Sequence, residues 1–178
     1  MVQLKSLKFD NLEIGFPVVQ AALSGYSDWP MRLMARRNGA SYGVCEVMLD
    51  QFLVNMKSNR KKNKHFLHIS DEERPVGGQL MGAEPEQFSA GAVKLVEAGY
   101  DVIDINFGCP VKKVVSKGAG AGILKDIDLM VKLTSEMVKR THLPVTVKTR
   151  LGWDENSIMI VEVAERLQDA GAKAIAIH

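Results

Sequence analysis

Hydrophobic residues are grouped in two alternating ways along this chain of 178 residues. Short runs rich in β-branched residues predict strands at residues 17–22, 42–48, 75–81, 101–106, 144–149 and 173–178. Longer amphipathic stretches predict helices at residues 28–37, 85–98, 126–140 and 156–170. Strands that alternate with helices are typical of parallel βαβ units, so the pattern predicts an α/β fold.

Residues at the predicted helix ends support this division of the chain. Asp28 is a candidate N-cap for the first helix, and the Asn-Gly pair at residues 38–39 stops it. Pro85 begins the second helix and Gly99 follows its end, which is the usual asymmetry of helix termini. The helices are therefore expected to be separate elements joined by short turns.

The predicted strands are nearly continuous apolar runs, as expected for strands that are covered on both faces. Their even spacing favours a (β/α)8 TIM barrel over a doubly wound sheet, and no G-x-G-x-x-G motif follows the first strand. An eight-stranded barrel typically needs about 250 residues. We therefore expect residues 1–178 to be the N-terminal portion of a barrel catalytic domain, truncated to about six strands. An intact six-stranded α/β protein is the alternative.

Polar residues lie near the C-terminal ends of the predicted strands, where a parallel barrel places its active site. Asp104 and Asn106 are two residues apart and share one face, as do Lys148 and Arg150. Burying such groups without partners costs several kcal/mol each, so their common position indicates a ligand site. Each group also has a structural alternative, such as a solvated strand end or, for Asp104, the capping of a loop. The other strand-end polar residues are Gln79, His178 and Glu46, the last of which we expect to support backbone.

The two cysteines have different settings. Cys109 follows the fourth predicted strand at the start of a loop, and Pro110 stiffens that loop because proline fixes φ. A thiol in such a place can donate a proton or attack as a thiolate. Cys45 lies inside a predicted strand, where we expect a small buried hydrophobe, and this is also the alternative for Cys109.

Two segments are rich in glycine or lysine. The string GAGAG at residues 118–122 lets backbone approach a ligand closely, and Lys112, Lys113 and Lys117 precede it. A basic loop on the rim of a barrel can meet a polyanion, although a solvated loop fits the pattern equally well. The basic run at residues 57–64 predicts the solvated face of a helix between the second and third strands.

Composition narrows the class of protein. Charged residues make up 25% of the chain and hydrophobic residues 46%, as in ordinary globular proteins. A net charge of +2 is too small to indicate nucleic-acid binding by itself. The two cysteines form no disulfide framework or zinc-ligand spacing, and the N-terminus lacks an apolar signal segment. We expect a cytoplasmic protein with no metal site and no membrane-spanning segment.

Several ordered motifs resemble those of the tRNA-dihydrouridine synthases, which are flavin-dependent (β/α)8 barrel enzymes. The most specific are DINFGCPVKKVVSKGAGAGIL at residues 104–124 and VTVKTRLGWD at residues 145–154. The first-strand and third-strand motifs are matched by AALSGYSDWPMR at residues 21–32 and GGQLMG at residues 77–82. The beginning of a sixth-strand His-Gly-Arg motif is matched by AIH at residues 176–178.

This resemblance implies FMN as the cofactor, NADPH as the reductant and a uridine of tRNA as the substrate. It implies that Cys109 protonates carbon 5 of the uracil after hydride transfer to carbon 6. The residues implied to hold the flavin are Ala22, Leu23, Ser24, Gln79, Asn106, Lys148 and His178. It implies that Arg150 contacts the flavin or the target base, and Lys112 of the basic loop is the other expected substrate contact.

Two departures from the family pattern bear on these expectations. Ala22 stands where the family usually has proline, and residues 1–178 lack the phosphate-binding loops after the seventh and eighth strands and the C-terminal helical tRNA-binding domain. Two other functions stay open: another FMN barrel, such as a dihydroorotate or dihydropyrimidine dehydrogenase, and a non-catalytic RNA-binding half-barrel. The spacing from Asn106 to Cys109 and the KTRLGWD segment favour the tRNA enzyme.

Overall fold

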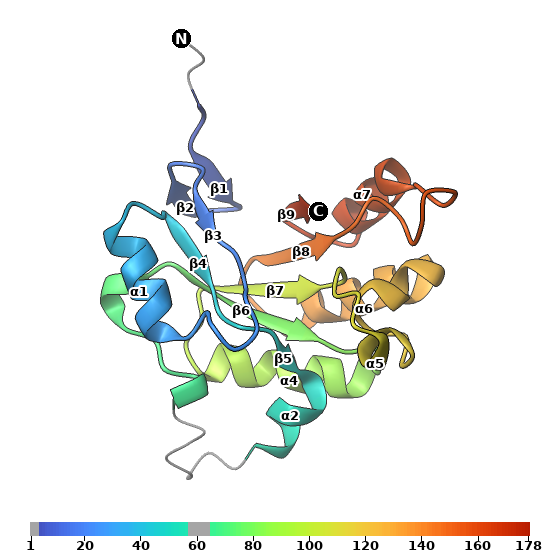
Figure 1. The fold of residues 1–178 in the computed structure, drawn as a ribbon, viewed down its shortest axis with the longest axis horizontal. Helices are drawn as coiled ribbons and strands as arrows, with labels where there is room; N and C mark the ends of the chain where they lie inside the picture. The colour runs from blue at the N-terminus through green and yellow to red at the C-terminus, as the bar shows by residue number, and fades with distance from the viewer. Residues whose placement is uncertain (1–3, 57–64) are drawn as a thin grey trace.

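A curved parallel sheet forms the centre of the computed structural model, which describes residues 4–56 and 65–178. Neighbouring strands of this sheet all run parallel, and the arrangement matches six consecutive strands of a (β/α)8 barrel (Figure 1). The short strand β5 (Met48–Leu49) also pairs with β6. In spatial order the strands are β3 (Val19–Gln20), β4 (Tyr42–Val44), β6 (Val76–Met81), β7 (Val102–Asn106), β8 (Val145–Thr149) and β9 (Ala174–Ile177).

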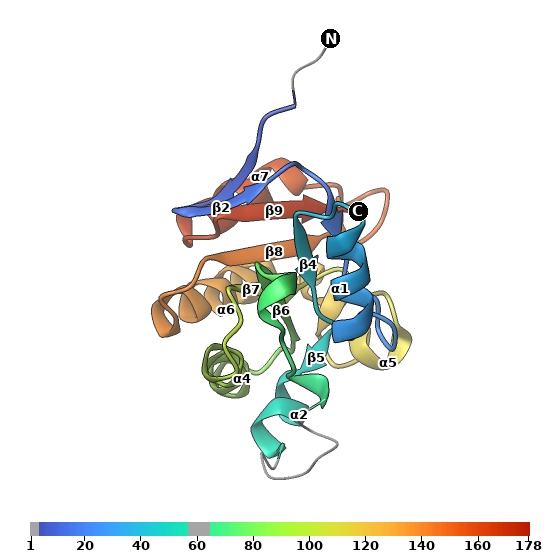
Figure 2. The same ribbon diagram turned by 90° about the vertical axis from the view of Figure 1, so that its left-hand side faces the viewer.

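Helices lie along the outer side of the sheet (Figures 1 and 2). The longer ones are α1 (Trp29–Arg37), α2 (Asp50–Asn55), α4 (Pro85–Glu97), α6 (Ile127–Arg140) and α7 (Ile160–Asp169). The other helical segments are the 3-10 helices η1 (Asp71–Glu73) and η2 (Gly120–Lys125) and the single-turn α5 (Lys112–Val115). The predicted basic helix face at residues 57–64 lies outside the described residues and stays a prediction.

The outer core lies between the sheet and its helices. Ile103 and Ile105 of β7 are fully buried there, in one cluster with Leu133 of α6. Since successive residues of a strand face opposite sides, Asp104 and Asn106 face the inside of the curve. The apolar positions of β7 thus fix which of its polar residues reach the interior.

Several predicted helix boundaries are confirmed by the structure. Asp28 caps α1 through its Oδ1, which accepts a hydrogen bond from the Met31 N–H at 3.2 Å. Asp126 caps α6 in the same way, with the Leu129 N–H at 3.0 Å. Gly99 follows α4 with a φ of 87°, a left-handed conformation that costs glycine little.

Two predicted strands are shorter than expected. The strand predicted at residues 17–22 is reduced to the two residues of β3, and the one at residues 42–48 is divided into β4 and β5. Between β4 and β5 the carboxylate of Glu46 accepts a hydrogen bond from the N–H of Gly25 at 2.7 Å. Glu46 therefore supports backbone, as predicted, but it does so within a break in the strand.

The helix predicted from residue 156 begins only at Ile160. The preceding loop has its own hydrogen bonds, because the hydroxyl of Ser157 accepts from the Asp154 N–H at 2.9 Å and donates to the Asp154 carboxylate at 2.9 Å. These local bonds hold residues 154–157 in a turn that competes with the helix.

The hydrophobic pattern missed an antiparallel hairpin that precedes the sheet. Its strands are β1 (Leu7–Phe9) and β2 (Leu12–Gly15). The rings of Phe9 and Tyr42 meet edge to face, with their centroids 5.4 Å apart. We call the buried group around these rings the floor cluster; its members are Phe9, Ile14, Tyr42, Val44 and Val102.

The hairpin also reaches the far edge of the sheet, beside β9 (Figure 2). Ala174 of β9 packs against the floor cluster, and the Lys173 ammonium lies 3.8 Å from the Asp10 carboxylate. The floor cluster therefore closes the N-terminal ends of the strands. Their C-terminal ends, which we call the rim, carry the predicted polar residues.

Candidate functional site

Strand register places predicted polar residues, together with Thr146, in two rows inside the curve. Gln79 of β6 pairs with Asp104 of β7, which pairs with Thr146 of β8. One step nearer the rim, Asn106 pairs with Lys148. The sheet therefore brings together side chains that are up to 69 residues apart in sequence, from Gln79 to Lys148.

Hydrogen bonds connect the side chains of these rows. The Nε2 of Gln79 donates to Asp104 Oδ2 at 2.7 Å, and the hydroxyl of Thr146 donates to the other oxygen of Asp104. The Nδ2 of Asn106 donates to the Oε1 of Gln79 at 2.8 Å. Asp104 therefore does not cap a loop, the alternative that the sequence left open, but joins three strands.

Asp104 is a carboxyl group in an apolar setting, only 6% exposed. Burial raises its pKa to about 6, while the hydrogen bonds from Thr146 and Gln79 and the charge of Lys148 oppose that rise. The group therefore changes its protonation state close to neutral pH.

Cys109 lies in a loop whose backbone is held from several directions. The Oδ1 of Asn106 accepts hydrogen bonds from the N–H groups of Gly108 at 3.1 Å and Cys109 at 3.0 Å. The Nε of Arg150 donates to the Gly108 carbonyl at 2.7 Å, and the Ala121 N–H donates to the Cys109 carbonyl at 2.9 Å. The partly exposed Cys109 is thus anchored to both β7 and the end of β8.

The glycine string at residues 118–122 has a packing role, and its predicted approach to a ligand stays a prediction. A Cβ on Gly120 would lie 2.6 Å from the Cys109 carbonyl oxygen, and one on Gly122 would lie 2.8 Å from the Val115 carbonyl oxygen. The glycines therefore allow η2 to approach the cysteine loop and α5 closely. In the structure the close approach is made to backbone of this chain.

Residues 22–24, the predicted first flavin-binding segment, lie in the loop after β3. Ala22 packs against the floor cluster, whereas Leu23 and Ser24 are exposed. The buried hydroxyl of Ser27 accepts from the Leu23 N–H at 2.8 Å and donates to the Leu23 carbonyl at 3.0 Å. These bonds and the one from Gly25 to Glu46 fix the loop at the rim.

The remaining predicted residues also lie on the rim side. Lys148 and Arg150 are half-buried at the end of β8, and Lys112 is exposed on α5. His178 follows β9 and is exposed; its N–H donates to the Thr149 carbonyl at 3.0 Å. By alternation along β9, His178 shares a face with Ala176, the register partner of Lys148.

Gln79 and Cys45 are both buried below the rim. Gln79 is 1% exposed, so Asn106 is the amide that a ligand at the rim can contact directly. The thiol of Cys45 accepts a hydrogen bond from the Gln79 N–H at 3.2 Å, and burial raises the pKa of this thiol to about 11. The prediction that Cys45 is a small buried core residue is confirmed.

Sequence reasoning missed a buried ion pair behind the first-strand loop. The guanidinium of Arg32 binds the Glu73 carboxylate, with Nε and Oε2 2.8 Å apart, and donates to the Ser27 carbonyl at 3.0 Å. No local pattern links residues forty-one positions apart. Thr146, which was also missed, could have been found because it is two residues before Lys148 and shares its face.

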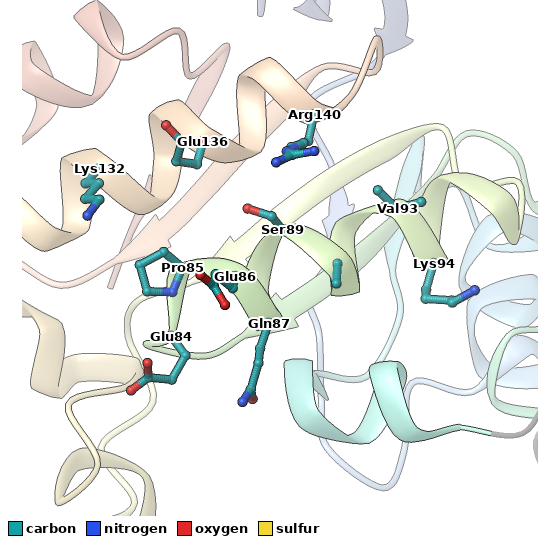
Figure 3. A pocket seen from close by; sticks show the side chains of 11 residues that line it. Glu84, Pro85, Glu86, Gln87, Ser89, Val93, Lys94, Lys132, Glu136 and Arg140 are labelled. Atoms are coloured by element: carbon teal, nitrogen blue, oxygen red, sulfur yellow. The ribbon is translucent and has the colours of Figure 1, made fainter.

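A separate groove lies on the outer surface between α4 and α6 (Figure 3). Its charged residues balance in sign and include Glu84, Glu86 and Glu136 against Lys94, Lys132 and Arg140. None of the polar residues at the strand ends lines this groove. Because its positive and negative side chains are mixed, the groove favours neither an anion nor a cation. The chemistry-bearing residues lie at the rim instead.

Neither a metal cluster nor a membrane-spanning helix is found among the described residues. Within residues 4–56 and 65–178, no group of three or more His, Cys, Asp or Glu side chains is arranged to hold a metal ion. In the same part of the chain, no helix combines the length and the apolar character that crossing a bilayer requires.

Comparison with known proteins places these residues in a family. A sequence model described as dihydrouridine synthase (Dus) matches residues 19–178. A protein of Pseudomonas aeruginosa named tRNA-dihydrouridine synthase B is 35% identical over 90% of this chain and 48% of its own length. Proteins named probable tRNA-dihydrouridine synthase from Synechocystis and Rhodobacter capsulatus are 34% and 36% identical, over 98% and 97% of this chain and 48% and 53% of their own. The chain thus spans about half the length of the curated relatives it matches.

Proposed function

Because this chain belongs to the dihydrouridine synthase family, we propose that it is the N-terminal portion of a flavin enzyme that reduces uridine to dihydrouridine in tRNA. The proposal includes FMN as the flavin, NADPH as the reductant, tRNA as the partner and the cytoplasm as the location. The observation that carries it is the hydrogen-bonded link from the strand-end amides to the backbone of Cys109.

The donor set at the rim suits a flavin ring. An oxidised isoalloxazine presents two carbonyl oxygens and the nitrogens N1 and N5 as acceptors, which require hydrogen-bond donors, while its N3–H is itself a donor. Lys148 supplies an ammonium, and the Nδ2 of its register partner Asn106 keeps a second hydrogen besides the one given to Gln79. The backbone of residues 22–24 and His178 complete the proposed set, and Gln79 supports Asn106 from below. When bound, FMN would supply hydride transfer, with NADPH as the reductant of the flavin.

Cys109 is the proposed proton donor to carbon 5 of the uracil. Its backbone is fixed by Asn106 and Ala121, so the thiol projects from a rigid point. A positioned general acid contributes typically about 10²–10⁴ in rate. Lys148 and Arg150 carry positive charge on the same rim and stabilise negative charge that develops on the uracil oxygens. Lys112, exposed on the neighbouring α5, is proposed to contact the RNA backbone.

The test compares Cys109→Ala with the wild type in the full-length protein. We expect Cys109→Ala to keep its visible flavin absorbance and to lose at least about a hundredfold in dihydrouridine formation, measured by mass spectrometry of tRNA. Ser116→Ala is the matched control, because Ser116 is exposed just after α5 and its hydroxyl donates to the nearby Lys113 carbonyl.

Three outcomes would contradict the proposal. Normal dihydrouridine formation by Cys109→Ala would show that Cys109 is not the proton donor. Reduction of a free pyrimidine base with no activity on tRNA would favour a dehydrogenase of another flavin-barrel family. A colourless protein that binds RNA in a salt-dependent way would favour an RNA-binding role without catalysis.

A further inference from the structure

Asp104 is the buried end of a directed chain of hydrogen bonds that finishes at Cys109. The chain runs from Asp104 to Gln79 at 2.7 Å, from Gln79 to Asn106 at 2.8 Å and from Asn106 to the Cys109 N–H at 3.0 Å. We propose that Asp104 is a positioning residue, which sets the orientation of both amides and thereby the place of the Cys109 loop. The consequence for catalysis rests on the proposed function, but the consequence for the loop does not.

Both ends of this chain require the same orientation of the amide groups. Above its pKa of about 6 the Asp104 carboxylate only accepts hydrogen bonds, so at neutral pH the nitrogen of the Gln79 amide must face Asp104. Backbone N–H groups only donate, so the oxygen of the Asn106 amide must face Gly108 and Cys109. The oxygen of Gln79 then meets the nitrogen of Asn106, and every contact pairs a donor with an acceptor.

Loss of the acceptor at residue 104 would release the amide of Gln79. If that amide turned over, its nitrogen would face the nitrogen of Asn106, and two donors would oppose each other. Asn106 would then have to move, together with the two N–H groups that it holds. Strand β6 is buried and Gln79 is 1% exposed, so water does not offer an easy substitute partner.

A carboxylate is not the only group that can begin the chain. An asparagine at residue 104 can offer its oxygen to Gln79 and its amide hydrogens to Thr146, because a hydroxyl can accept as well as donate. Leucine, which has a similar volume, offers no acceptor. The positioning role therefore predicts that Asp104→Asn keeps the hydrogen bonds of the Cys109 loop, whereas Asp104→Leu loses them.

The experiment measures backbone amide exchange at Gly108 and Cys109 by NMR, in the full-length protein. We expect exchange about tenfold faster in Asp104→Leu and wild-type protection in Asp104→Asn. Gln79→Met interrupts the chain at its second member and serves if Asp104→Leu does not fold; it is expected to expose the same two amides. Thr134→Val is the control, because Thr134 is as buried as Gln79 but its hydroxyl donates within its own helix, to the Met130 carbonyl.

The proposal is overturned if Asp104→Leu and Gln79→Met leave both amides protected, or if Asp104→Asn exposes them as Asp104→Leu does. Faster exchange in Thr134→Val would also overturn it, because general loosening would then explain the result. For dihydrouridine formation we expect a lower kcat with little change in KM for Asp104→Leu, and near wild-type values for Asp104→Asn. Since exchange is read without substrate, an inactive wild type with the expected exchange pattern would reject the proposed function and leave the positioning role standing.

Discussion

Burying the ionised Asp104 side chain costs folding free energy, but the same side chain orients its neighbours through hydrogen bonds. Its carboxyl group is buried on the same face as Thr146, Gln79 and Lys148, and the buried Tyr42 and Cys45 also face it. Burial favours the protonated form, and the hydrogen bonds favour the ionised form. Because burial prevails, the ionised group opposes folding while it orders its neighbours.

At the residue scale, this balance predicts a pH-dependent difference between Asp104→Asn and the wild type. The folded-state pKa of about 6 lies above the usual value of 3.8, so the stability that protonation contributes is lost as pH rises toward 6. Two pKa units correspond to about 3 kcal/mol, which is the upper limit for the change. From pH 4 to pH 7 the wild type should therefore lose stability relative to Asp104→Asn.

Urea unfolding at a series of pH values measures this difference. The variant Asp126→Asn serves as a control, because Asp126 is a helix cap whose side chain is exposed. Parallel stability curves for Asp104→Asn and the wild type between pH 4 and pH 7 would contradict the assignment of a raised pKa to Asp104.

At the scale of elements, η2 and the cysteine loop touch through their backbones. Gly120 has a φ of 55°, and an added Cβ would lie 2.6 Å from the Cys109 carbonyl oxygen and 2.9 Å from a methyl group of Val114. A carbonyl that is already bonded to Ala121 cannot move without carrying the loop along. The short element η2 therefore determines where the thiol lies.

Gly120→Ala is expected to lower the melting temperature and to change the alkylation rate of Cys109. Gly118→Ala is its matched control, because Gly118 has a similar φ of 74° but a Cβ there would meet only the Ala83 Cβ at 4.0 Å. Both variants carry a left-handed alanine that costs about 1–2 kcal/mol, and only Gly120→Ala adds the clash. Equal thiol reactivity in the two variants would show that η2 does not position the loop.

Helices and strands were predictable to different degrees for physical reasons. Asp28 and Gly99 are local signals, and the helix ends that depend on them were found. The break at Glu46 depends on a partner twenty-one residues away, at Gly25, so no local pattern could reveal it. The candidate site was largely predictable because alternation along β7 and β8 decides which polar residues share a face. The hydrogen bonds that link β6 to β7 and to the cysteine loop could not be predicted, because they depend on the register between strands.

At the scale of the whole molecule, the floor cluster joins the first and last elements of the chain. Phe9 of the hairpin contacts Tyr42 of β4, and Ala174 at the start of β9 packs against the same cluster. The hairpin residues Phe9 and Ile14 thus add apolar surface to the N-terminal ends of the strands.

Phe9→Ala should therefore destabilise the whole molecule. The expected loss is about 3 kcal/mol in the free energy of unfolding, since a buried phenylalanine loses its contacts and leaves a cavity. Phe16→Ala is the control, because Phe16 is 56% exposed and its loss should change stability by less than about 0.5 kcal/mol. Chemical denaturation followed by circular dichroism measures both, and equal effects would contradict the role of the floor cluster.

The row formed by Gln79, Asp104 and Thr146 also favours the native strand register during folding. A slip of β7 by one position would turn Asp104 toward the helices, where an unpaired carboxyl group would replace Ile103 or Ile105. A slip by two positions would keep the faces but separate the carboxyl group from its partners on both neighbouring strands. The same three side chains that support the rim thus disfavour misaligned sheets. Their loss should lower the stability of the folded protein and also yield chains with mispaired strands, which are prone to aggregate.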